Sequence, residues 1–163
     1  MAATSPAGPA PAEGLVIATV RFGTIEQVVV APSALFSFPE ALPGLPDSHR
    51  YVLIGDQNSA PLFWLQSLED QAACLPVVES ASLAVAGYAE QVSQSLGAAP
   101  DARVFVVARF DPEANSFVVN LLAPVILDRR AGTGKQIVLD GQGYALRQEV
   151  RWDATARNFV VPC

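Results

Sequence analysis

The chain has 163 residues, of which 51% are hydrophobic and 16% are charged, and its formal net charge is −6. This length fits one domain with its own core, and the composition excludes a globally disordered chain. The acidic balance disfavours direct nucleic acid binding because phosphates repel such a surface, and no apolar run approaches the ~20 residues that span a bilayer.

The N-terminal residues 1–14 are rich in Ala, Pro, Ser and Gly and contain no Lys or Arg. They lack the basic start and apolar centre of a secretory signal, and they have little apolar surface to offset the entropy of ordering. We therefore expect a disordered tail. The two cysteines, Cys74 and Cys163, are too few for a disulfide scaffold and fit a reducing environment, so a cytoplasmic location is expected.

Short β-rich runs separated by turn residues fill the first half of the chain. The turn Phe22-Gly23-Thr24 predicts an initial hairpin, and Gly55 to Asn58 ends a later strand. The predicted strands in this half are 15–21, 25–30, 35–38, 51–54, 61–68 and 75–79.

One helix is predicted at 82–96, where apolar residues recur at helical spacing and Gly97 can cap the end. A loop at 111–115 separates two further strands. Pro124 lies inside the second of them and implies an edge position or a bulge, because proline donates no ladder hydrogen bond. The predicted strands in this half are 103–110, 116–127, 136–139 and 144–147.

This pattern of short strands at regular spacing with one short helix predicts a mostly β protein. The expected architecture is a compact, antiparallel β-barrel or sandwich-like single domain over residues 15–147. Residues 148–163 are assigned to a C-terminal tail. Its apolar residues would supply a late strand or a docking segment: Trp152, Phe159, Val160 and Val161.

Catalytic and cofactor motifs are incomplete in this sequence. Residues 132–135 resemble part of a phosphate-binding loop, but Arg129 and Gln136 stand where the motif needs Gly and Ser or Thr. His49 is the only histidine, so a zinc site or a catalytic triad is not expected. The paired carboxylates lie in predicted turns, where they do not converge on a pocket. We expect neither an enzyme nor a cofactor.

The phrase F-P-E-A-L-P-G-L at residues 38–45 predicts a stiff loop, since two prolines fix φ and Gly44 permits a positive φ. Leu42 and Leu45 on this loop either plug the end of a barrel or form a preorganised contact for a partner. The aromatic pair Phe63-Trp64 is interpreted as core or interface, because base-stacking platforms come with basic grooves.

Four phrases, in this order, resemble the flagellar assembly factor FliW family. They are F-P-E-A-L-P-G from residue 38, L-Q-S from 65, N-L-L-A-P-V-I-L from 120, and G-K-Q-I-V-L from 134 followed by Tyr144 and Arg147. The similarity covers about residues 16–147. The motif residues are Phe38, Pro39, Leu42, Pro43, Gly44, Gln66, Ser67, Asn120, Pro124 and Gln136.

The resemblance implies a compact β fold without catalysis and two protein partners. It implies binding to the translational regulator CsrA, which relieves CsrA repression of flagellin mRNA, and binding to flagellin, which competes for the protein. We hypothesise that acidic loops dock beside the RNA groove of the basic CsrA dimer and oppose RNA electrostatically over the ~8–10 Å screening length. The candidate residues are Glu69, Asp70, Asp111 and Glu113.

A second hypothesis concerns flagellin, whose amphipathic ends would seek an apolar groove. The candidate residues for that groove are Leu42, Leu45 and Phe63. The alternative is a small β-barrel ligand-binding or interaction domain without CsrA activity. A ligand binder needs a pocket with convergent polar groups, and the sequence shows no constellation of residues for one.

Overall fold

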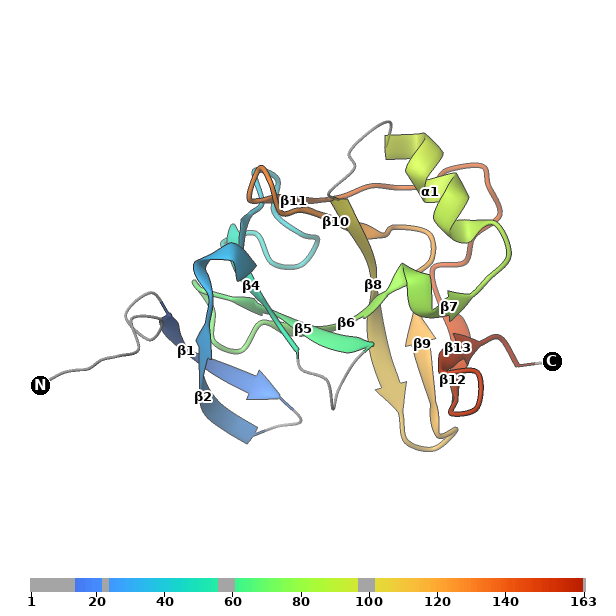
Figure 1. Cartoon of the computed structure of the whole chain (residues 1–163), viewed down its shortest axis with the longest axis horizontal. Coiled ribbons are helices and arrows are strands. Elements are labelled where there is room, and N and C mark those ends of the chain that lie inside the picture. The colour runs from blue at the N-terminus through green and yellow to red at the C-terminus, as the bar shows by residue number, and fades with distance from the viewer. Residues whose placement is uncertain (1–13, 22–23, 56–60, 97–101, 163) are drawn as a thin grey trace, which may run out of the picture.

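The computed structural model describes residues 14–21, 24–55, 61–96 and 102–162, and Figure 1 shows their arrangement. The strands are β1 (Leu15–Arg21), β2 (Thr24–Val30), β3 (Leu35–Ser37), β4 (Arg50–Ile54), β5 (Leu62–Ser67), β6 (Cys74–Glu79), β7 (Leu83–Ala84), β8 (Ala102–Asp111), β9 (Ser116–Val119), β10 (Val125–Asp128), β11 (Thr133–Gln136), β12 (Gln148–Asp153) and β13 (Asn158–Val160). The helices are the short 3-10 turns η2 (Pro32–Ala34) and η3 (Ser80–Ser82) and the α-helix α1 (Tyr88–Leu96).

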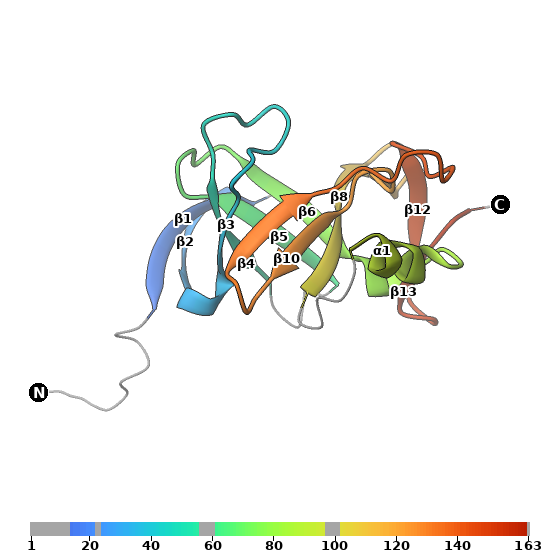
Figure 2. The same ribbon diagram turned by 90° about the horizontal axis from the view of Figure 1, so that it is seen from above.

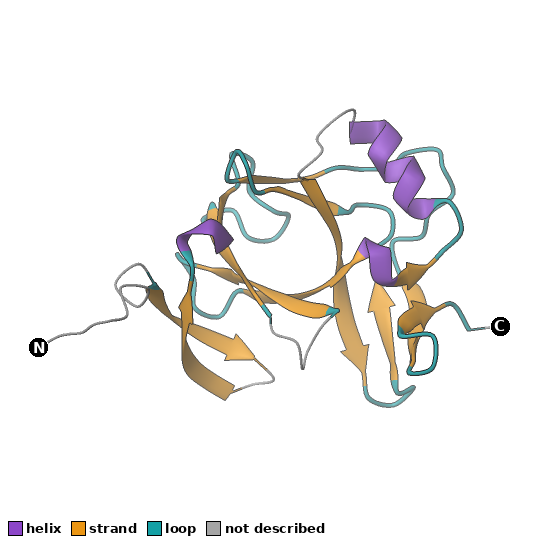
Figure 3. Ribbon diagram, viewed as in Figure 1, coloured by secondary structure: helices purple, strands orange, loops and turns teal. Residues whose placement is uncertain are grey.

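The strand pairings form a ring in the order β10, β11, β3, β4, β5, β6 and β8, because β10 pairs with both β11 and β8. The link between β11 and β3 is a single parallel pair, Thr133↔Ser37. Figure 3 shows these strands encircling the interior. Large apolar side chains fill it, among them Phe38, Tyr51 and Phe105, each 0% exposed. The predicted mostly β, compact single-domain fold is confirmed.

Strand β8 is long enough to belong to two sheets. Phe105 to Val107 pair with β6, whereas Ala108 to Asp111 pair with β9. The second sheet continues through β12 and β13 to β7. Helix α1 covers this sheet, because its buried residues Tyr88 and Val92 belong to the same apolar cluster as the strand residues.

The β1–β2 hairpin packs on the outside of the ring. Ile17 and Val30 contact a cluster with Val52, Ile54 and Trp64 from β4 and β5. Figure 2 shows this hairpin and β12 at opposite ends of the molecule.

The single long strand predicted at 116–127 is wrong. The structure has β9, then an irregular loop at 120–124, then β10. The loop is stable because Asn120 Oδ1 accepts a hydrogen bond from the Ala123 N–H at 3.0 Å, and Pro124 has no N–H to place in a ladder. The break lets the chain leave the second sheet and return to the ring.

Helix α1 begins at Tyr88, six residues later than predicted. Residues Ser80–Ser82 form η3, and Leu83–Ala84 form β7, which pairs in parallel with β13. Gly87 has a φ of 76°, which ends the extended segment before the helix. Propensity predicted a longer helix, and the pairing with a strand far away in sequence overrides it.

The strands predicted at 136–139 and 144–147 are also corrected. The strand in this region, β11, ends at Gln136. Beyond it, the Ile137 N–H donates to the Pro124 carbonyl at 3.1 Å and the Leu139 N–H to the Leu122 carbonyl at 2.8 Å. Residues 137–139 therefore tie themselves to the 120–124 loop, and 144–147 form no strand.

The two segments assigned to tails differ in what the structure describes. Of residues 1–14, all but Gly14 lie outside the described residues. The C-terminal segment carries β12 and β13, and Val150 at 0% and Phe159 at 3% exposure lie in the core. The folded chain therefore continues past residue 147, with the late strand that the apolar residues predicted. No helix in the described part of the chain is long and apolar enough to cross a membrane.

Candidate functional site: an apolar groove

The loop between β3 and β4 is closed at its base by two hydrogen bonds. The Phe38 N–H donates to the His49 carbonyl at 2.7 Å, and His49 Nδ1 lies 2.9 Å from the Phe38 carbonyl oxygen. Within the loop the Leu45 N–H donates to the Leu42 carbonyl at 3.0 Å, and Gly44 has a φ of 83°. The loop is therefore a stiff turn, as its prolines predicted.

Gly134 and Phe38 fix this loop to the ring. The Phe38 ring is fully buried and meets the Tyr51 ring edge-on at 5.0 Å between centroids. A Cβ atom on Gly134 would lie under 3.0 Å from three carbons of the Phe38 ring. Only glycine leaves room here, so the glycine before Lys135 and the phenylalanine at 38 form one packing unit.

Asn120 and Gln136 organise the second loop. Besides the Asn120–Ala123 hydrogen bond described above, Gln136 Nε2 donates to the Ala123 carbonyl at 2.9 Å. Both polar side chains are thus engaged by the backbone. They fix the position of the loop, whose residues Leu121 and Ala123 are buried.

These two loops border an apolar groove of about 600 Å³. Leu42 forms part of its floor at 5% exposure, while Val138 and Leu146 on the rim are 58% and 57% exposed. None of the described residues that line the groove is ionisable, so its lining suits apolar side chains. Its lining is Leu42, Pro43, Gly44, Leu45, Leu75, Val107, Asn120, Leu122, Ala123, Gln136, Val138 and Leu146.

The L-Q-S phrase builds the turn between β5 and β6. Gln66 is 0% exposed, and its Nε2 donates to the carbonyls of Ser67 at 3.0 Å and Gln71 at 3.1 Å. Ser67 Oγ accepts the N–H groups of Glu69 and Asp70, each at 3.0 Å. The motif residues therefore hold two acidic side chains on a fixed turn.

Glu69 on this turn is engaged by the strand beside it. Its carboxylate accepts the Arg50 Nε–H at 2.7 Å and the backbone N–H groups of His49 and Arg50, each at 3.0 Å. The hydrogen bond from the Arg50 side chain is the main cause that lowers the pKa of Glu69 below its usual value. Glu69 is ionised at neutral pH, but much of its charge is directed at Arg50.

The predicted apolar candidates separate in the structure. Leu42 and Leu45 lie in the groove, whereas Phe63 lines a different hollow of about 150 Å³. There Phe63 packs against Phe105 at 5.6 Å, and the Arg103 guanidinium lies 5.3 Å from the centre of its ring. Of the three candidates, only Leu42 and Leu45 share the groove, and their role in binding stays a prediction.

The acidic candidates occupy two turns. Glu69 and Asp70 follow β5, whereas Asp111 and Glu113 lie where β8 turns into β9, and these turns lie apart in both Figures 1 and 2. Sequence reasoning missed the groove residues Leu75, Leu122, Val138 and Leu146. Of these, only Val138 and Leu122 lie in the recognised phrases, and no local pattern brings the four together.

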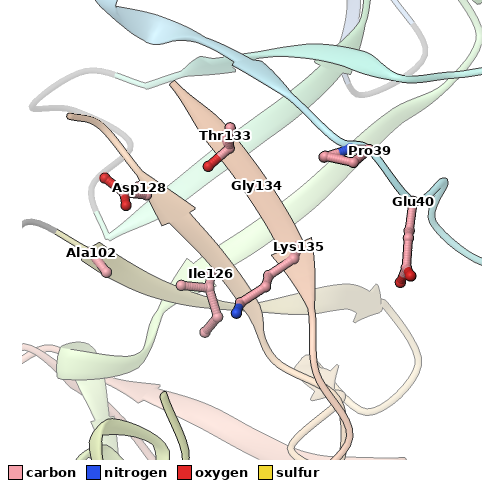
Figure 4. Close-up of a pocket in the computed structure, with 8 residues that line it drawn as sticks. All are labelled: Pro39, Glu40, Ala102, Ile126, Asp128, Thr133, Gly134 and Lys135. Atoms are coloured by element: carbon pink, nitrogen blue, oxygen red, sulfur yellow. The ribbon is translucent and has the colours of Figure 1, made fainter. Parts of the chain in front are cut away.

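A second hollow, of about 430 Å³, lies on the outer face of β10 and β11. Figure 4 shows Lys135 extending toward Ile126, with Glu40 and Asp128 on either side. The segment that resembles part of a phosphate loop is strand β11, without the following helix that phosphate binding needs. Within the described ranges, no group of three or more His, Cys, Asp or Glu side chains could hold a metal ion.

Fold and site together define a compact, mostly β domain with an apolar groove on its surface. The family model described as FliW protein matches residues 16–150. The chain therefore belongs to the FliW family.

Individual relatives agree with that assignment. The flagellar assembly factor FliW of Bdellovibrio bacteriovorus is 30% identical over 141 residues, covering 83% of this chain and 79% of its own. That of Desulfitobacterium hafniense strain DCB-2 is 29% identical over 147 residues, covering 87% and 95%. A crystal structure of the flagellar assembly factor FliW matches with a TM-score of 0.64 at 21% identity, covering 82% and 95%. At that identity the structural match supports the fold.

Proposed function

We propose that this chain is a non-enzymatic, cytoplasmic assembly factor that binds flagellin and CsrA and thereby relieves CsrA repression of flagellin mRNA translation. Family membership supports the proposal, since the curated relatives are named flagellar assembly factors. The single observation that carries it is that residues of three family phrases, at 38–45, 120–127 and 134–139, line one apolar groove.

The groove is the proposed flagellin site. An amphipathic helix inserts apolar side chains spaced three and four residues apart into such a groove. A volume of about 600 Å³ accommodates several of them. The groove is preorganised, because Gly134, Asn120 and Gln136 fix its two loops without any partner, and this lowers the entropy cost of binding.

The acidic turns are the proposed CsrA contacts. A net charge of −6 favours association with a basic protein and opposes RNA in the same place. Glu113 lies exposed on the β8–β9 turn, whereas Glu69 is paired with Arg50. The β8–β9 turn therefore contributes more to the repulsion of RNA.

Calorimetric titration of the folded chain with flagellin monomer tests the groove. The informative variant is Leu146→Asp, because Leu146 is 57% exposed and its replacement leaves the core intact, unlike that of the buried Leu42. We expect low-micromolar or tighter binding by the parent chain, near −8 kcal/mol, and at least ~10-fold weaker binding by the variant. The matched control is Val161→Asp, at an apolar residue of 42% exposure outside the groove lining. Equal losses in both variants would contradict the groove assignment.

Displacement of RNA from CsrA tests the acidic turns. Two neutralised variants are compared, Glu69→Gln with Asp70→Asn on one turn and Asp111→Asn with Glu113→Gln on the other. We expect the second pair to reduce displacement more, and the exposed Glu90→Gln on α1 to leave it unchanged. Full displacement by a variant neutralised at all four positions would refute the electrostatic mechanism, and no binding of CsrA by the parent chain would refute the CsrA role.

A further inference from the structure

The β1–β2 hairpin is apolar on both of its faces. Ile17 and Val30 pack against the ring, while Val16, Ile25 and Val29 on the opposite face are 61%, 66% and 66% exposed. Val16 and Val29 are directly opposite each other across the two strands. A strand pair with apolar residues on both faces is typical of a sheet that is covered on both sides.

The hairpin also has unused strand edges. It forms a sheet of two strands in the described part of the chain, and β2 pairs with β1 alone. The pair Arg21↔Thr24 flanks a two-residue connection, and such a pair exchanges hydrogen bonds in a hairpin. Along an antiparallel strand, residues that hydrogen-bond to the partner strand alternate with residues that do not. Because Thr24 bonds to β1, the backbone N–H and C=O groups of Ile25, Gln27 and Val29 point away from β1, toward the open edge of β2.

The sequence of β2 is self-complementary about Gln27. In an antiparallel pairing of two β2 strands centred there, Ile25 of one copy lies opposite Val29 of the other, and Gln27 lies opposite Gln27. Apolar residues then meet apolar residues and the amides meet each other. Glu26 faces the other side of the sheet and lies opposite Val28, so no like charges are opposed.

We propose that a second copy of this chain pairs with β2 through this edge, giving a four-stranded sheet across a two-fold axis at Gln27. The interface is isologous, and it brings the exposed Val16, Ile25 and Val29 of both copies into one apolar strip. A second copy fits better than an unrelated strand, because in this register residues 24–30 of one copy pair with residues 30–24 of the other. An acidic or basic partner would find no charged side chain on this outer face of β2.

Analytical ultracentrifugation of the full chain tests the oligomeric state. We expect the mass to rise from one chain to two with increasing concentration up to about 100 µM. Val29→Lys places two like charges in the apolar strip and should weaken self-association at least ~10-fold. Val161→Lys, at an exposed valine on the far side of the molecule, should not. A mass of one chain throughout the concentration range would overturn the proposal.

Disulfide trapping tests the register. In a Cys163→Ser background, Gln27→Cys places two thiols opposite each other at about 5.5 Å between Cα atoms, within the range for a disulfide. Thr24→Cys is the control, since the two copies of residue 24 would lie about 20 Å apart along the strands. We expect covalent dimers from Gln27→Cys alone. A dimer that persists in Val29→Lys, or equal cross-linking of both cysteine variants, would also overturn the proposal.

Discussion

At the scale of single residues, Gly134 is a position where even a methyl group does not fit. The variant Gly134→Ala should destabilise the domain by about 1–3 kcal/mol, because the added methyl overlaps the buried ring of Phe38. Combining it with Phe38→Leu, which removes the ring, should cost less than the sum of the single changes by about 1 kcal/mol or more. Urea unfolding of the four proteins measures this coupling.

Gly132→Ala is the matched control for that cycle. Gly132 has a φ of 70°, and a Cβ atom added to it would meet nothing within 4 Å, so its substitution costs backbone strain of about 1–2 kcal/mol without any clash. Phe38→Leu should not relieve that strain. Additive effects of Gly134→Ala and Phe38→Leu would show that the ring does not hold the loop against β11.

Glu69 makes the β5–β6 turn sensitive to acid. The pKa of Glu69 is lower in the folded chain than in the unfolded chain, where it is about 4.3. The stability that the ionised side chain adds is therefore fully present above this unfolded-state pKa and is lost as pH falls through the lower folded-state pKa. Thermal unfolding of Glu69→Gln between about pH 3 and 6 should show a flatter acid limb than the parent chain. Because the Arg50–Glu69 pair is partly exposed, the difference should be small and should shrink in salt. An acid limb of Glu69→Gln as steep as that of the parent chain would contradict this role of Glu69.

At the scale of elements, sequence patterns located most strands but not where the chain changes sheet. Alternation and turn residues predicted β1, β4 and β8 closely, because their hydrogen-bonding partners and turns are local or their apolar runs are long. The 116–127 run looked continuous because β9 and β10 are both apolar. Asn120 and Pro124 mark the break in the sequence, but the loop that they form is also held by Gln136, which is distant in sequence. The groove was predicted only in its first loop for the same reason.

Strand β13 is the element that decides where the domain ends. Phe159→Ala should destabilise the fold by about 3–5 kcal/mol, since the ring is 3% exposed and packs against Phe117 and Trp152. Trp152→Ala, at 41% exposure on the paired strand, should cost clearly less. Urea unfolding compares the two. A negligible loss in Phe159→Ala would mean that the residues after 147 do not contribute to the core.

At the scale of the whole molecule, the family phrases are distant in sequence and adjacent in space. Phe38 rests on Gly134, and Asn120 and Gln136 both act on Ala123, so three of the phrases share one physical role, the construction of two loops around a groove. The acidic turns that follow β5 and β8 do not line the groove, so the groove and these turns are separate on the surface of this acidic chain.

That separation predicts different salt dependences for the two proposed partners. Binding of flagellin in a groove whose described lining residues are not ionisable should change less than ~2-fold between about 50 mM and 500 mM salt, because burial of apolar surface is not screened. Binding of CsrA should weaken at least ~10-fold over the same range, since long-range attraction to a chain of net charge −6 is screened within a few ångströms at the higher salt. Calorimetry of each pair at four salt concentrations measures both slopes, and Leu146→Asp checks that the flagellin signal comes from the groove. Equal slopes for the two partners would mean that they use the same surface.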